Sequence, residues 1–168
     1  VLRMVDIPTV SIVIASTSVV LAAIYYILSL RHQTKLRQTD LVMRLYSDYR
    51  SNEFREALIK VMNLQFEDYE DYVKKYGPWF SDEPAHKAMA MVAMFFEGIG
   101  ILLYKKLIDA SLTYDLFSFA PIKLYWEKMK PVILGLREQY NEPKIFEWFE
   151  YLYNEMKKRE QTLQPSTP

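Results

Sequence analysis

An uncharged apolar run near the N-terminus constrains the fold of this chain more than any other feature. Residues Ile7–Leu30 contain no charged side chain, Asp6 precedes them and Arg31 follows them. As an α-helix, these 24 residues span roughly 36 Å, enough to cross a hydrocarbon core of about 30 Å with some tilt. Pro8 fits the first turn, where its missing N–H costs little. The run therefore predicts a transmembrane helix over residues 7–30.

A cleaved signal peptide is the alternative reading of this run. It fits less well, because a signal peptide has a shorter apolar segment and a basic N-terminal flank. In this chain the flank has no net charge, since the charges of Arg3 and Asp6 cancel. Basic residues follow the run, and basic flanks stay in the cytoplasm, so residues 1–6 are predicted outside the cell membrane and the following domain inside. Aromatic and basic side chains at that end are predicted interface anchors: Tyr25, Tyr26, Arg31, Lys35 and Arg37.

Small residues share one face of the predicted span. They follow spacings of four, three, four and seven, which places them on the same side of a helix. Such a face lets another helix approach closely within lipid, so it predicts packing against another subunit's span or a second copy. Chance is the alternative, because small residues are common in spans. The residues are Ser11, Ala15, Ser18, Ala22 and Ser29.

The rest of the chain predicts a helical bundle over residues 31–160, and the predicted fold class is all-α. Only four glycines occur in the chain, which disfavours a turn-rich β protein. Ser81 is expected to cap the central helix, Pro131 to kink or break a later one, and residues 161–168 to form a flexible tail. The predicted helices are 33–50, one capped by Ser51, 67–76, 84–106, 108–119, 121–140 and 141–160.

The predicted central helix carries the residue of greatest chemical interest. Ala88–Tyr104 is apolar except for Glu97, a pattern typical of a buried helix or of a second span. A buried helix is preferred, because a mid-span carboxylate is costly in lipid. A buried carboxylate pairs with a donor or stays protonated, so Glu97 predicts either an acid/base site or a polar pair that fixes helix register, with a Tyr, a Trp or Arg137 as partner.

Composition and residue spacing argue against most other kinds of functional site. The chain has no cysteine, which excludes disulfides and thiolate sites. His32 and His86 are far apart and lack a second ligand nearby, so no metal site is predicted, and His86 is expected at the surface. Gly98 and Gly100 lie inside a helix pattern, where they are expected to permit close helix contact, and no cofactor is predicted. Basic and acidic residues number 21 each, which gives no support to nucleic-acid binding.

Three short segments carry a resemblance to a known family. They are Phe95–Leu103 (FFEGIGILL), Leu107–Asp109 (LID) and Glu147–Leu152 (EWFEYL). Together with one N-terminal span, they resemble domain-of-unknown-function family 4760, small prokaryotic helical proteins that often bear a membrane anchor. The resemblance implies an α-helical fold and membrane association. It implies no reaction, and no catalytic residue comes with it.

These observations favour a non-enzymatic, membrane-anchored helical interaction module, an accessory or structural subunit of a membrane protein complex. Its expected partners are membrane lipid and other membrane-protein subunits, or a second copy bound through the transmembrane helix. The alternative function is a membrane-bound sensor or enzyme with a ligand pocket around Glu97. A two-span protein, with Ala88–Tyr104 also in lipid, is a third and weaker alternative.

Overall fold

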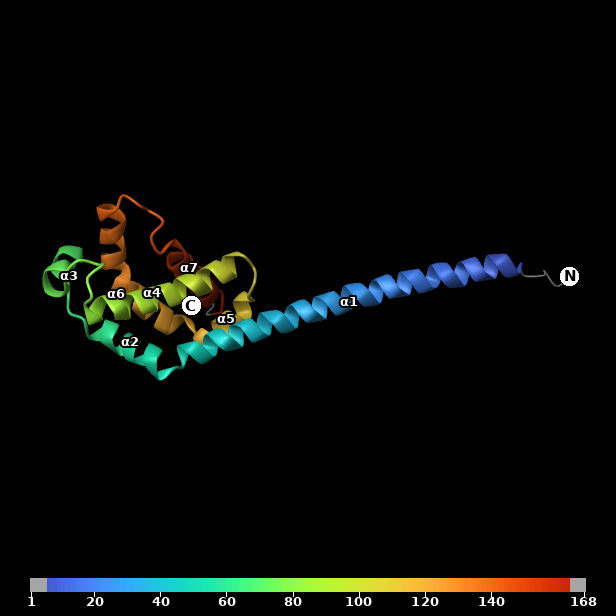
Figure 1. The fold of residues 1–168 in the computed structure, drawn as a ribbon, viewed down its shortest axis with the longest axis horizontal. Coiled ribbons are helices and arrows are strands. Elements are labelled where there is room, and N and C mark those ends of the chain that lie inside the picture. The colour runs from blue at the N-terminus through green and yellow to red at the C-terminus, as the bar shows by residue number, and fades with distance from the viewer. Residues whose placement is uncertain (1–5, 164–168) are drawn as a thin grey trace, which may run out of the picture. The chain divides into compact units, whose positions relative to one another are not determined.

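The computed structural model describes residues 6–163 of the chain, which are all-helical and contain no strand (Figure 1). Contacts divide the chain after Asp40, and the domain that begins at Leu41 holds most of them. The helices are α1 (Ile7–Tyr49), α2 (Asn52–Asn63), α3 (Tyr69–Tyr76), α4 (Pro84–Tyr104), α5 (Ala110–Phe117), α6 (Phe119–Gln139) and α7 (Glu147–Leu163).

Helix α1 covers two helices that the sequence predicted next to each other, with direct continuation left open. The predicted span 7–30 and the predicted helix 33–50 form one continuous helix of 43 residues. No glycine or proline occurs after Pro8 until the helix ends, so nothing interrupts the backbone ladder. The residues after Asp40 belong to the domain, where Val42 is fully buried and Tyr49 lies 5.7 Å from Phe54, ring to ring.

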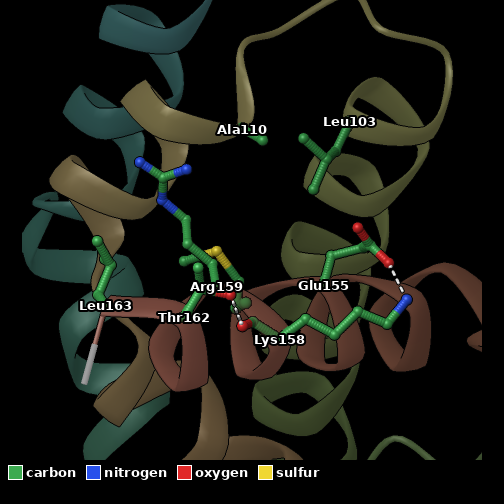
Figure 2. Close-up of a pocket in the computed structure, with 8 residues that line it drawn as sticks. Leu103, Ala110, Glu155, Lys158, Arg159, Thr162 and Leu163 are labelled. Carbon is green, nitrogen blue, oxygen red and sulfur yellow. Dashed lines mark hydrogen bonds and ion pairs between the residues drawn. The ribbon is translucent and has the colours of Figure 1, made fainter. Parts of the chain in front are cut away.

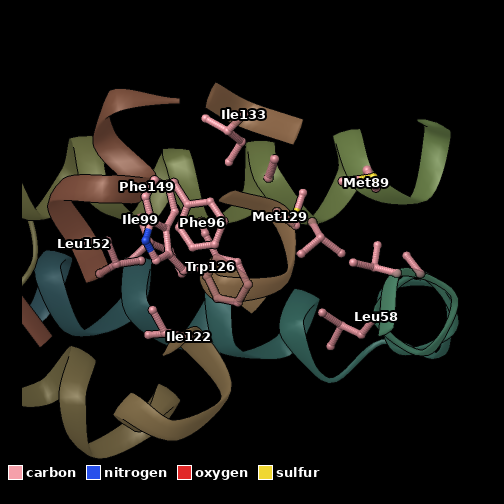
Figure 3. Packing of buried hydrophobic residues seen from close by; sticks show 14 of the residues in the cluster. Leu58, Met89, Phe96, Ile99, Ile122, Trp126, Met129, Ile133, Phe149 and Leu152 are labelled. Carbon is pink, nitrogen blue, oxygen red and sulfur yellow. The ribbon is translucent and has the colours of Figure 1, made fainter. Parts of the chain in front are cut away.

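Helix α4 is the centre of the domain and packs mainly against α7 and α2. Its buried side carries Met89, Phe96 and Ile99, each with no exposed surface (Figure 3). The Phe96 ring stacks on Phe149 of α7, with centroids 5.0 Å apart. The opposite side is exposed, since 66% of Met94 faces solvent. The central helix is therefore buried along one side, not all round as its composition suggested.

Polar side chains begin the shorter helices as local rules predict. Ser51 accepts a hydrogen bond from the Phe54 N–H at 3.1 Å, which confirms the predicted cap of α2. Asp68 and Asp109 cap α3 and α5 in the same way. The predicted cap of α4 is wrong. Glu83 occupies that position without a side-chain hydrogen bond, because the Ser81 hydroxyl pairs with a histidine instead.

The last two helices depart most from the sequence prediction. Pro131 lies inside α6 without ending it; neighbours such as Met129 and Val132 are fully buried and hold the helix in place. Helix α7 begins at residue 147, not 141, because Asn141 and Phe146 adopt left-handed backbone angles, with φ of 49° and 54°.

The predicted ends of the chain fall partly outside the described residues. Helix α7 runs to Leu163, so the first three residues of the predicted tail 161–168 are helical. Residues 164–168, and residues 1–5 of the predicted exterior segment 1–6, lie outside the described range.

Candidate functional site

The first part of α1 presents an exposed apolar surface. Residues 7–28 are all exposed, including Ile12 at 68% and Leu21 at 61%. By length and composition, α1 and α4 are both candidates to cross a membrane, but α4 is partly buried within the domain. A continuous apolar helix with this exposure would be unfavourable in water. Helix α1 is therefore the stronger candidate span.

Several serine and threonine hydroxyls in this segment are satisfied within the helix itself. Ser11 donates to the Ile7 carbonyl at 3.0 Å, and Ser18 donates to the Ile14 carbonyl at 2.8 Å. Thr17 bonds to Val13 in the same way. Such bonds remove donors that lipid could not satisfy. The segment thus carries no hydroxyl donor that requires water at these positions.

The predicted packing face and interface anchors lie on this one helix. Tyr25 and Tyr26 are 76% and 63% exposed, and the three predicted basic anchors are exposed as well: Arg31, Lys35 and Arg37. The five small residues are also on α1, and all but Ser29 are exposed. Their binding to lipid or to another helix stays a prediction.

Glu97 of α4 supports the start of α7. Its Oε2 accepts a hydrogen bond from the Phe149 N–H at 2.7 Å, in the first turn of that helix. The residue just before α7 is Phe146, whose side chain has no acceptor. Glu97 therefore supplies from another helix the acceptor that a local Ser or Asp would normally provide, and its charge suits the positive end of the helix dipole.

The partner of Glu97 differs from those expected. Arg137 was one predicted partner, but its Nη1 donates to Glu150 and its Nε to the Ile145 carbonyl, at 2.7 and 2.8 Å. Burial raises the pKa of Glu97, while backbone hydrogen bonds from Phe149 and Trp148 act in the opposite direction and lower it. The contacts are those of a structural polar pair, and they support the second of the two roles considered for Glu97.

A glycine makes this approach of α4 to α7 possible. A Cβ atom added to Gly100 would lie 1.9 Å from the Trp148 carbonyl oxygen, which is far inside van der Waals contact. A Cβ added to Gly98 would meet nothing within 4 Å. The expected role in close helix contact is therefore right for Gly100 and wrong for Gly98.

The structure places His86 in the interior, so the expected surface position is wrong. Its side chain is 3% exposed, and Ser81 Oγ lies 2.7 Å from its Nδ1. Tyr72 and Trp79 pack around the imidazole ring. The signal was available in the sequence, because His86 lies three residues before the buried Met89 and so on the same face of α4.

This Ser–His pair is best explained by burial. The hydroxyl satisfies one nitrogen of a buried imidazole, while His86 Nε2 and the Tyr72 hydroxyl are buried without a partner. Within residues 6–163, no cluster of three His, Asp or Glu side chains could hold a metal ion.

A family model described as "Domain of unknown function (DUF4760)" matches residues 12–156. The chain belongs to the DUF4760 family. The match begins inside the apolar part of α1 and ends within α7, so the DUF4760 pattern includes both the candidate span and the helical domain. No curated protein and no solved structure shows a significant match to the chain.

Proposed function

We propose that this DUF4760 protein is a non-enzymatic interaction module, anchored in the cell membrane by α1 and acting as an accessory subunit of a membrane protein complex. The observation that carries the proposal is the continuous exposure of residues 7–28. The hydroxyls of Ser11, Thr17 and Ser18 bond to carbonyls of the same helix, which suits a lipid environment. A helix of this kind gains far more by entering a bilayer than by remaining in water.

The proposed orientation places the helical domain in the cytoplasm. The basic residues Arg31, Lys35 and Arg37 follow the apolar run and are exposed on α1. Positive charges on this side favour retention in the cytoplasm and attract anionic headgroups. Protease treatment of right-side-out and inside-out vesicles tests the orientation. Cleavage of the domain only in inside-out vesicles is expected, and cleavage only in right-side-out vesicles would reverse the assignment.

The proposed partner contact uses the small-residue face of α1. Within lipid, association depends on close packing of small residues more than on apolar contact. The domain offers little evidence for chemistry, because Glu97 is engaged in supporting α7. This combination favours a structural partner over a substrate.

Native mass spectrometry of the complex extracted in mild detergent tests the proposed function. The expected result is a mass that includes other membrane subunits or a second copy. Ala22→Phe should disrupt that assembly, because a large ring on the small-residue face prevents close approach. Val20→Phe is the matched control, since two residues turn the helix by about 200° and Val20 is 56% exposed. A wild-type mass of one chain alone would refute the proposal.

A further inference from the structure

A cavity of about 270 Å³ lies where α4 ends, α5 begins and α7 runs toward its last turn (Figure 2). Its walls are largely apolar. Leu103 comes from α4, Ala110 from the start of α5, and Met156 and Leu163 from α7. Leu103 and Met156 are buried, so the apolar wall is part of the packed domain. The cavity lies entirely within the domain that begins at Leu41.

Two cations line the same cavity, and they differ in their surroundings. The Lys158 ammonium is paired with the Glu155 carboxylate at 2.6 Å, so its charge is already balanced. The Arg159 guanidinium contacts two neutral groups. Its Nη2 donates to Ser111 Oγ at 2.7 Å, and its carbon lies 5.3 Å from the centre of the Tyr114 ring.

Arg159 also retains an unused donor. Its Nε is buried and has no hydrogen-bond partner. A buried donor without an acceptor is costly, and a guanidinium beside an apolar wall favours a planar anion such as a carboxylate. In Figure 2 the Arg159 side chain extends from α7 toward the segment that carries Ala110. The cavity thus combines an apolar wall with a cation whose guanidinium donates to a neutral hydroxyl.

We propose that this cavity binds a small anionic amphiphile, with its carboxylate on Arg159 and its alkyl chain against Leu103 and Met156. At about 30 Å³ per water-sized group, the cavity volume corresponds to roughly nine such groups. A medium-chain fatty acid has this size and this distribution of charge. The residues that line the cavity come from α4, α5 and α7, so the proposal goes beyond the interaction role of α1 and does not depend on it.

Calorimetric titration of the full chain with octanoate tests the proposal directly. The protein is held in nanodiscs of zwitterionic lipid, and nanodiscs without protein measure the partitioning of octanoate into lipid. Saturable binding at one site per chain is expected. Octanol has the same chain without the charge, so it should bind roughly tenfold or more weakly, because a charge-assisted hydrogen bond is lost. Equal binding of octanol, or no saturable binding of octanoate, would overturn the proposal.

Two variants place the site in the molecule. Arg159→Met keeps length and apolar contact but removes the charge, so octanoate affinity should fall about tenfold or more. Lys157→Met is the matched control, because Lys157 is exposed and does not line the cavity; it should bind as wild type does. Thr162→Phe fills the opening from an exposed position on α7 and should abolish binding even if Arg159→Met fails to fold. Unchanged affinity in Thr162→Phe would refute this location.

A last comparison identifies the source of the anion. The titration is repeated in nanodiscs that contain an anionic lipid. Weaker apparent binding of octanoate would show that the lipid competes for the Arg159 site, and unchanged binding would assign the site to the free acid. Both results support an anionic amphiphile at this cavity, provided that Thr162→Phe removes the binding.

Discussion

Replacement of Gly100 by alanine tests the close contact between α4 and α7. The added Cβ atom would lie 1.9 Å from the Trp148 carbonyl oxygen and 2.6 Å from its carbonyl carbon. Real Cβ atoms essentially never approach closer than 3.0 Å, so the backbone of α7 must move by at least about 1 Å. That movement also strains the 2.7 Å hydrogen bond from Phe149 to Glu97.

The expected cost follows from three terms. Overpacking costs about 1–3 kcal/mol, and a weakened helix cap costs about 1 kcal/mol. Alanine recovers up to about 1 kcal/mol through its higher helix propensity. The free energy of unfolding of Gly100→Ala should therefore fall by about 1–3 kcal/mol.

Gly98 offers a matched control in the same helix. A Cβ atom there meets nothing within 4 Å, so Gly98→Ala should raise the free energy of unfolding by about 0.5–1 kcal/mol. Urea titration of the full chain in mild detergent, followed by tryptophan fluorescence, measures both. All three tryptophans lie after Asp40, in the domain. If Gly100→Ala is as stable as Gly98→Ala, the close contact is refuted.

Two further predictions concern polar side chains in the domain. Burial raises the pKa of Glu97, so its contribution to stability is greatest below the ordinary value of 4.5 and is lost as the pH rises through the raised pKa. The free energy of unfolding of wild type minus that of Glu97→Gln should accordingly fall between acid and neutral pH, as measured by urea titrations at a series of pH values. The same difference at every pH would contradict this cause. Ser81→Ala removes the 2.7 Å contact to buried His86 and should cost about 1–3 kcal/mol in the same assay. Glu83→Ala, which removes an N-cap side chain that makes no hydrogen bond, should cost measurably less.

Local sequence was sufficient for the features that depend on neighbouring residues. The uncharged run predicted a helix over residues 7–30, and α1 begins at Ile7, because composition and the absence of breaking residues act along the chain. Ser51 predicted the cap of α2, since its hydroxyl reaches an N–H only three residues away. The all-helical class followed from the same periodicity and from the scarcity of glycine.

The tertiary structure alone decided the features that depend on which helix faces meet. Gly98 and Gly100 look equivalent in the sequence, yet only Gly100 points at α7, because two residues turn a helix by about 200°. The donor to Glu97 is the backbone N–H of Phe149, fifty-two residues further along the chain. The predicted partners were polar side chains, so they did not include it. The spacing of His86 from Met89 indicated its face of α4, but the residues that bury it, Tyr72 and Trp79, lie outside its own helix and were known only from the structure. These outcomes depend on three-dimensional contacts. Helical periodicity predicts on which face of its helix a residue lies, but not which element packs against that face.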